Sequence, residues 1–202
     1  FIKAAGHEVG ISLFEESMVH IAKDLLKDGK IILPETVVTS KTFEGDDIQE
    51  KNIAEVRENE MILDQFLNEE IESIISSSRT ILWNGPLGVF ENKYFSRGTE
   101  QLSNSIAKSD AFSISGGGET LTAINKFINK DDVSYVTNVN ISIAPDTAVA
   151  PYALLYGNLI YVGYVTVVGV AFCVICKDIV CVLFWSNNEI YLGSMDNKSI
   201  MP

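Results

Sequence analysis

One pattern constrains the fold more than any other: a short apolar run that ends at glycine and is followed by apolar residues at helical spacing. Residues 80–83 run into Asn-Gly-Pro, which stops a strand and turns the backbone. Residues 111–115 run into three glycines, and helical spacing follows over residues 121–128. The order strand, helix, strand, helix predicts an α/β fold, a parallel sheet with helices on both faces. Both glycine loops then lie at the carboxyl ends of strands, where ligands bind.

The first loop, residues 83–91, reads Trp-Asn-Gly-Pro-Leu-Gly-Val-Phe-Glu. It places two glycines, the side-chain amide of Asn84 and the carboxylate of Glu91 close together. This combination suits a ligand whose ribose or phosphates approach the backbone closely. The residues alone leave a second interpretation open, in which Asn-Gly-Pro is an ordinary turn and Glu91 a solvated surface charge.

The second loop, residues 116–120, reads Gly-Gly-Gly-Glu-Thr and lies between a predicted strand and a predicted helix. Glycines let backbone N–H groups converge on an anion, and the helix dipole adds partial positive charge where a phosphate would rest. No Gly-Lys-Ser/Thr follows, so this is not a P-loop, and the Gly-x-Gly-x-x-Gly spacing of dinucleotide-binding dehydrogenases is absent. A flexible strand-to-helix turn is the alternative interpretation.

Residues 83–91 closely resemble the signature loop of the phosphoglycerate kinase family, and residues 116–120 resemble its Gly-Gly-Gly-Asp-Thr motif. Residues 1–6 and 33–38 are also similar to family segments. The resemblance covers residues 1 to about 137 and implies part of the C-terminal nucleotide-binding domain, a Rossmann-like fold that is incomplete here. The family's reaction is phosphoryl transfer between 1,3-bisphosphoglycerate and ADP in glycolysis.

The resemblance also implies roles for single residues. Glu91 would accept hydrogen bonds from the ribose hydroxyls, and Asn84 would face the transferring phosphates. Gly117, Gly118 and Thr120 would offer backbone and hydroxyl donors to those phosphates. The implied ligand is ATP or ADP with Mg²⁺.

Glu119 stands where relatives carry the aspartate that meets the nucleotide-bound Mg²⁺, so Glu119 is the metal-ligating candidate. Its longer side chain implies coordination through water or in a shifted pose, because Mg²⁺ requires near-ideal octahedral geometry. Family catalysis rests on positioning and electrostatics. The basic groups that supply the charge, in the N-terminal domain and near an upstream glycine loop, have no counterpart in this sequence. We therefore expect no catalytic residue here, no activity from the chain alone, and a separate partner chain carrying the N-terminal domain.

The N-terminal elements are predicted from pattern alone. Ser12 and Glu15 form a capping box before a helix whose apolar stripe extends to Leu26. Residues 30–33 form a strand that stops at proline, and the polar residues 42–60 form a surface connection with short strands at best.

Residues 60–77 read as one helix, with inward side chains that include Ile62, Phe66 and Ile71. Family relatives carry Asp-Ile-Gly-Pro where residues 64–67 read Asp-Gln-Phe-Leu. Loss of both glycine and proline predicts helix in place of a loop that helps to line the nucleotide pocket.

We expect two regions, a partial nucleotide-binding domain over residues 1–137 and an apolar tail over residues 138–202. The chain begins with Phe1 rather than Met, which we interpret as a missing front. Residues 148–176 carry no charged side chain, yet proline and several glycines make them a poor membrane helix. Out-of-frame translation and a membrane-associated tail are the two hypotheses for this region, and membrane contact is not favoured.

The formal net charge of −12 argues against a nucleic-acid-binding protein, which would need a basic face to neutralise phosphates. It also disfavours attraction to anionic membrane surfaces. We therefore expect a cytoplasmic protein whose partner is a nucleotide and not a nucleic acid. The alternative function is a non-catalytic or decayed nucleotide-binding remnant, membrane-associated through its tail.

Overall fold

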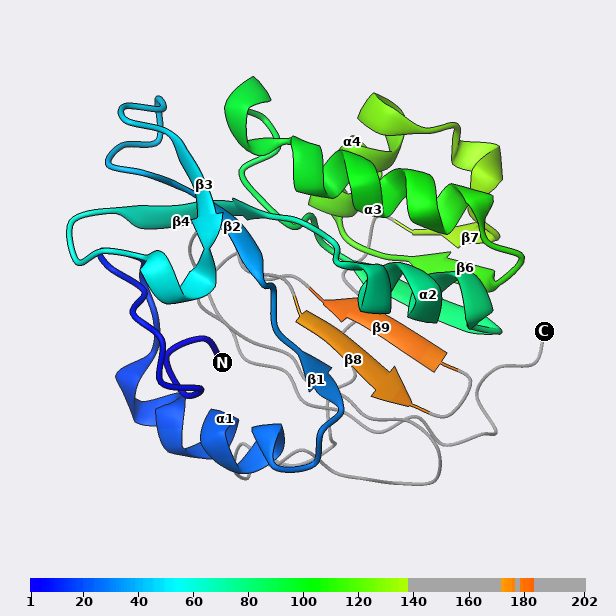
Figure 1. Ribbon diagram of the computed structural model, residues 1–202. Coiled ribbons are helices and arrows are strands. Elements are labelled where there is room, and N and C mark those ends of the chain that lie inside the picture. Colours follow the sequence, from blue (N-terminus) through cyan, green and yellow to red (C-terminus); the bar gives the residue numbers. More distant parts are fainter. Residues whose placement is uncertain (138–171, 177–178, 184–202) are drawn as a thin grey trace.

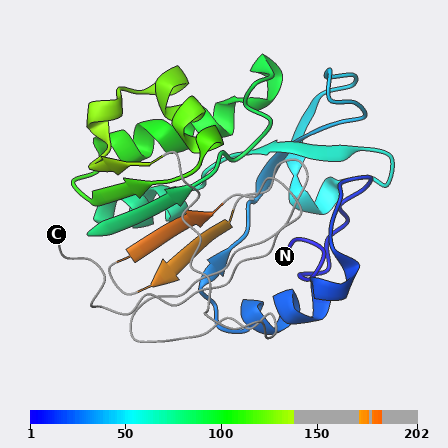
Figure 2. The ribbon, with the colours of Figure 1, turned by 180° about the vertical axis from the view of Figure 1, so that it is seen from behind.

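The computed structural model describes residues 1–137, 172–176 and 179–183, which form two sheets and four α-helices (Figures 1 and 2). The α-helices are α1 (Val19–Leu26), α2 (Glu69–Ser77), α3 (Arg97–Lys108) and α4 (Gly118–Phe127). Short 3-10 helices are η1 (Glu16–Met18), η2 (Ile53–Glu55), η3 (Lys93–Phe95) and η4 (Lys130–Asp132). The strands are β1 (Ile31–Ile32), β2 (Thr36–Ser40), β3 (Gln49–Asn52), β4 (Met61–Gln65), β5 (Thr80–Asn84), β6 (Phe112–Ser115), β7 (Tyr135–Val136), β8 (Phe172–Cys176) and β9 (Ile179–Leu183).

The larger sheet has six strands in the order β1-β8-β9-β5-β6-β7. Strands β9, β5, β6 and β7 pair in parallel, whereas β8 is antiparallel to both of its neighbours. The strands predicted at residues 80–83 and 111–115 are confirmed as β5 and β6, and the helices expected after them are confirmed as α3 and α4. The predicted α/β class with a parallel sheet is therefore confirmed, with one antiparallel strand inserted.

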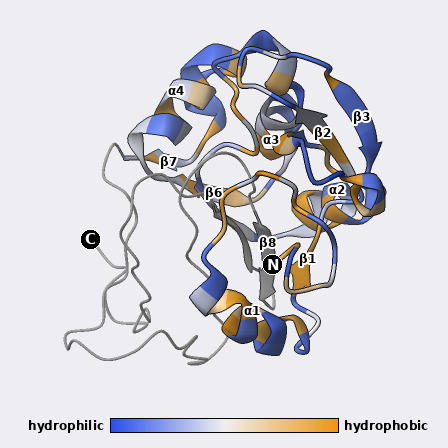
Figure 3. Ribbon diagram, turned by 90° about the vertical axis from the view of Figure 1, so that its left-hand side faces the viewer, coloured by the Kyte–Doolittle hydropathy of each residue, from blue (hydrophilic) through white to orange (hydrophobic). Residues whose placement is uncertain are grey.

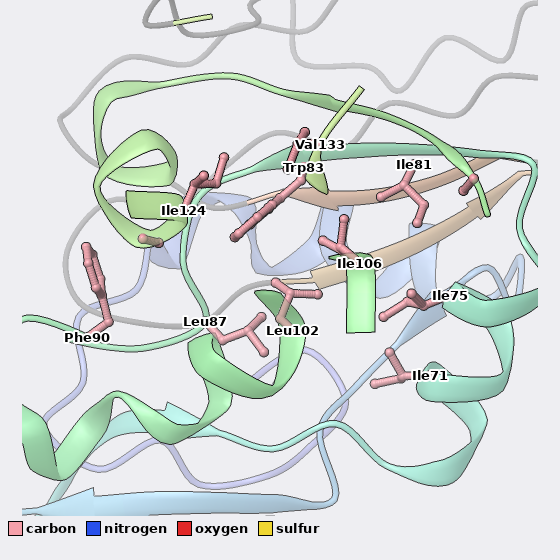
Figure 4. Close-up of a cluster of buried hydrophobic side chains, with 12 residues drawn as sticks. Ile71, Ile75, Ile81, Trp83, Leu87, Phe90, Leu102, Ile106, Ile124 and Val133 are labelled. Atoms are coloured by element: carbon pink, nitrogen blue, oxygen red, sulfur yellow. The ribbon is translucent and has the colours of Figure 1, made fainter. Parts of the chain in front are cut away.

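Helices α2, α3 and α4 pack over the face of this sheet that carries Ile81 and Trp83 (Figure 4). Side chains alternate along a strand, so Ile81 and Trp83 share a face, and both are fully buried. The same buried cluster contains Ile75 of α2, Leu102 of α3 and Ile124 of α4. Helix α1 lies beside β1, at the opposite edge of the sheet from β7, and apolar and polar residues alternate along it (Figures 1 and 3).

The smaller sheet is antiparallel, in the order β3-β2-β4, and holds a buried ion pair. Lys51 Nζ lies 2.7 Å and 2.9 Å from the two carboxylate oxygens of Glu60, and their side chains are only 6% and 4% exposed. The short strand β3 agrees with the prediction for residues 42–60. The assignment of that stretch to the surface is wrong at Lys51 and Glu60, because the two opposite charges pair with each other and are buried together.

The helix predicted over residues 60–77 is wrong in its first half. Residues 61–65 are strand β4, which pairs with β2, and the helix begins only at Glu69. The side chain of Asn68 caps α2 by accepting the N–H of Ile71 at 2.9 Å. Apolar residues at positions 62 and 66 fit a helical repeat as well as a strand, and cross-strand pairing with β2 decided between them. The replaced Gly-Pro segment therefore did not become helix.

The predicted capping box at Ser12 and Glu15 is also wrong. The Ser12 hydroxyl accepts the N–H of Ile62, 50 residues away in sequence, at 2.9 Å. Glu15 instead caps the short helix η1 by accepting the N–H of Ser17, and α1 starts only at Val19. The capping box was predicted from local spacing alone, whereas the Ser12 hydroxyl ties the N-terminal segment to β4.

Within the region expected to be a tail, the structure describes β8 and β9, which join the larger sheet between β1 and β5. The remaining residues of 138–202 lie outside the described part, and so do most of the residues of the membrane hypothesis. Among the helices that the structure describes, none has the length and apolar character needed to span a bilayer.

Candidate functional site

The two predicted loops follow neighbouring parallel strands and touch each other. Trp83 of β5 pairs with Ser115 of β6, and the Gly116 N–H donates to the Trp83 carbonyl at 3.0 Å. The Gly85 N–H donates to Thr120 Oγ1 at 2.6 Å, across 35 residues of sequence. The Asn-Gly-Pro turn and the first turn of α4 are thus joined at the carboxyl edge of the sheet, where ligands bind in α/β folds.

Glycine is required at the turning point of each loop. Gly85 has φ 116° and Gly117 has φ 91°, a region that other residues rarely adopt. The turn at Gly85 is held by the indole N–H of Trp83, which donates to the Gly85 carbonyl at 2.7 Å. Gly117 is the N-cap residue of α4, so the first N–H groups of that helix have no partner within it.

Gly118 is exposed at the start of α4, and a Cβ built there meets nothing within 4 Å. The open space therefore faces the end of the helix that carries partial positive charge. Glu119 follows in the same turn and is half-buried. This end of α4 has the geometry and charge that favour a phosphate.

Glu91 lies near the opposite end of α4. It occupies a turn closed by the Asn92 N–H donating to the Val89 carbonyl at 3.0 Å, and it is exposed. The neighbouring Phe90 carbonyl accepts a hydrogen bond from Lys126 Nζ, in the last turn of α4. At about 1.5 Å per residue, the helix separates its Gly118 end from Lys126 by about 12 Å. One helix therefore connects the glycine loop with the neighbourhood of Glu91.

A layer of buried polar groups from α3 and β4 supports the first loop, residues 83–91. Thr99 Oγ1, fully buried in α3, accepts the N–H groups of Leu87 at 3.0 Å and of Gly88 at 3.4 Å. The Val89 N–H donates to the Leu63 carbonyl at 2.9 Å. Three successive backbone donors are thus fixed, so the loop that carries Asn84 and Glu91 is rigid between them.

Asp64 is the buried carboxyl of this layer. Its two oxygens accept the N–H groups of Gly98, in the first turn of α3, and of Gln65, both at 2.9 Å. Burial raises the pKa of Asp64 to about 7, and these hydrogen bonds oppose the rise. The absence of a side chain at Gly88 and Gly98 makes space for the Asp64 carboxyl. A Cβ at Gly88 would lie 2.4 Å from Asp64 Oδ1, and one at Gly98 would lie 2.6 Å from it.

The structure brings the predicted site residues to two ends of one helix. Gly117, Gly118, Glu119 and Thr120 lie at the first turn of α4, and Glu91 lies near its last turn. Asn84 is half-buried at the end of β5 and directly precedes Gly85, which contacts Thr120. The Thr120 side chain is only 1% exposed, and its hydroxyl oxygen is engaged by Gly85. Within the described residues, no group of three or more His, Cys, Asp or Glu side chains could hold a metal ion.

Sequence reasoning missed the supporting residues Asp64, Thr99 and Lys126. The sequence does carry a signal for Asp64, because it directly follows the apolar pair Ile62 and Leu63. A carboxyl at that position indicates either a buried charge or the end of the strand. Thr99 had no sequence signal for this role, because the two N–H groups that it accepts lie 11 and 12 residues away. Lys126 had no sequence signal, because its partner is a backbone carbonyl 36 residues away.

Comparison with known proteins gives a consistent result. The family model "Phosphoglycerate kinase" matches residues 1–140. Phosphoglycerate kinases of Vibrio campbellii and Francisella philomiragia are 45% and 47% identical to the chain over 140 and 145 residues, which cover 68% of the chain and 36% and 37% of the relatives. The structure of the Coxiella burnetii phosphoglycerate kinase superposes with a TM-score of 0.63 at 35% identity, covering 69% of this chain and 38% of that one.

The chain spans little more than a third of the length of the curated relatives that it matches. The matched part contains both loops, the helix between them and the supporting layer beneath. The resemblance of letters at residues 83–91 and 116–120 is therefore part of a similarity that extends through the whole described N-terminal region, and the chain belongs to the phosphoglycerate kinase family.

Proposed function

We propose that the chain supplies the nucleotide side of a phosphoglycerate kinase, which transfers a phosphoryl group between 1,3-bisphosphoglycerate and ADP. The observation that carries the proposal is the contact between Gly85 and Thr120, which unites the two glycine loops at the carboxyl edge of the sheet. The family's place in glycolysis supports a cytoplasmic location.

In this proposal the phosphates of ADP or ATP rest at the first turn of α4. Gly117, Gly118 and Thr120 offer backbone N–H groups, and the open space at Gly118 admits the anion. Asn84 faces the same phosphates from the end of β5. Glu91 accepts the ribose hydroxyls at the other end of the helix, a role that its exposure supports.

Glu119 is the residue that would hold the Mg²⁺ bound to the nucleotide. A single carboxylate fits this ion, which is usually held by one or two carboxylates and the phosphates of the substrate while keeping several waters. The ion would supply positive charge that neutralises the phosphates. The absence of a larger ligand cluster among the described residues suits such a substrate-borne ion.

The test is titration of the purified chain with ADP, with and without Mg²⁺, followed by melting temperature and calorimetry. A ligand at about 100 times its dissociation constant stabilises the fold by about 2.7 kcal/mol. We expect Glu91→Gln to weaken ADP binding, and Glu119→Gln to weaken only the magnesium-dependent part. Glu100→Gln, an exposed carboxylate on α3, is the matched control and should change neither.

Gly118→Ala adds a sharper test, because it separates binding from folding. The methyl group meets no protein atom, so we expect the fold to be unchanged or stabilised by up to about 1 kcal/mol. The methyl group would occupy the proposed phosphate position, so ADP affinity should fall. An unchanged melting temperature at millimolar ADP for the wild-type chain would instead favour the alternative, a non-catalytic remnant.

A further inference from the structure

We propose that Lys126 is a positioning residue that sets the separation between the phosphate end and the ribose end of the site. The inference rests on the proposed function and deepens it. Helix α4 is attached to the first loop at two points, Thr120 to Gly85 at its first turn and Lys126 to Phe90 at its last. The six helical steps from Thr120 to Lys126 therefore act as a fixed spacer of about 9 Å.

The contact at Lys126 orients the peptide group that leads into Glu91. The Phe90 side chain is only 1% exposed, so its ring fixes the position of the residue. The Phe90 carbonyl and the Glu91 nitrogen share one planar peptide group. Because Lys126 Nζ holds the carbonyl oxygen, it fixes the rotation of that plane and hence the direction in which Glu91 leaves the turn.

Aromatic rings hold the Lys126 ammonium group in place. Its Nζ lies 5.6 Å from the centre of the Phe90 ring and 5.2 Å from that of Phe127. The two rings pack edge to face, with centroids 6.3 Å apart and an interplanar angle of 61°. Two ring faces and one carbonyl restrict a side chain that would otherwise be mobile at the surface. Lys126 is thus ordered for a contact with the protein itself.

The experiment compares ADP with inorganic pyrophosphate, which can use only the phosphate end. We expect Lys126→Met to weaken ADP binding about fivefold and to leave the pyrophosphate dissociation constant unchanged. Lys126→Arg should restore ADP binding, because its guanidinium can donate to the same carbonyl and stack on the same rings. Lys130→Met removes an equal charge just beyond α4 and should affect neither ligand. Equal losses for ADP and pyrophosphate, or no loss for ADP, would overturn the proposal.

A measurement without ligand keeps this inference separate from the proposed function. The Asn92 N–H closes the turn at Glu91, so its hydrogen exchange reports whether that turn is held. We expect faster exchange in Lys126→Met than in wild type or Lys130→Met. Unchanged exchange would refute the role of Lys126 even if ADP binds, whereas a wild-type chain that binds no ADP would refute the proposed function alone.

Discussion

Asp64→Asn should remove the pH dependence of stability that the buried carboxyl imposes. Burial raises the pKa of Asp64 from 3.8 to about 7 in the folded chain, so the fold favours the protonated form. The stability from this group is fully present below pH 3.8 and is lost as the pH rises through 7. The difference corresponds to about 4 kcal/mol in total, or about 1.4 kcal/mol per pH unit within that window.

The assay is urea unfolding of wild type and Asp64→Asn at several pH values between 5 and 8. The asparagine cannot accept both N–H groups that Asp64 accepts from Gly98 and Gln65, so we expect the variant to be less stable by about 1 to 3 kcal/mol at pH 5. By pH 8 the gap should close or change sign. Taking the difference between the two proteins at each pH cancels the titration of all other groups. A difference independent of pH would show that these N–H groups and the α3 dipole outweigh burial and keep the carboxyl ionised.

Lys51→Met should destabilise the fold by about 3 to 5 kcal/mol in urea unfolding, because Glu60 would keep a buried charge without its cation; adding Glu60→Leu should recover most of the loss. Burial acts to raise the pKa of Glu60, but hydrogen bonds from Lys51 and the Arg57 N–H outweigh burial and lower the pKa. The stability that this pair contributes should therefore be lost on acidification below about pH 4.5. The double variant, which lacks both charges, should show no such loss. Gly98→Ala should cost about 3 kcal/mol, since its Cβ would lie 1.8 Å from the Gln65 carbonyl oxygen, and a melting temperature equal to that of wild type would contradict the packing of α3 on β4.

The sequence predicts best the elements whose signals are local. Residues 80–83 and 111–115 are apolar runs bounded by glycine, and both became strands at the positions expected. The glycines that need positive φ, Gly85 and Gly117, also lie in the loops predicted for a ligand. These features depend on neighbours within a few residues, which a single sequence displays directly.

Features that depend on distant partners were predicted poorly. Residues 61–65 became a strand because β2 was available to pair with them, and Ser12 serves the backbone of Ile62 rather than a helix. Lys51 and Glu60 are buried because they meet each other. In the candidate site, likewise, the sequence indicated the residues that face a ligand but not Lys126, whose contact links two segments far apart in the chain.

The indole of Trp83 gives the protein an internal optical reporter. This side chain is fully buried, and its indole N–H donates to the Gly85 carbonyl. Gly85 directly follows Asn84, and its own N–H donates to Thr120. The sequence contains just one other tryptophan, Trp185, so a Trp185→Phe background would leave a single emitter. Its fluorescence maximum and quenching should then follow any rearrangement of the turn between the two strands in real time, without an added label.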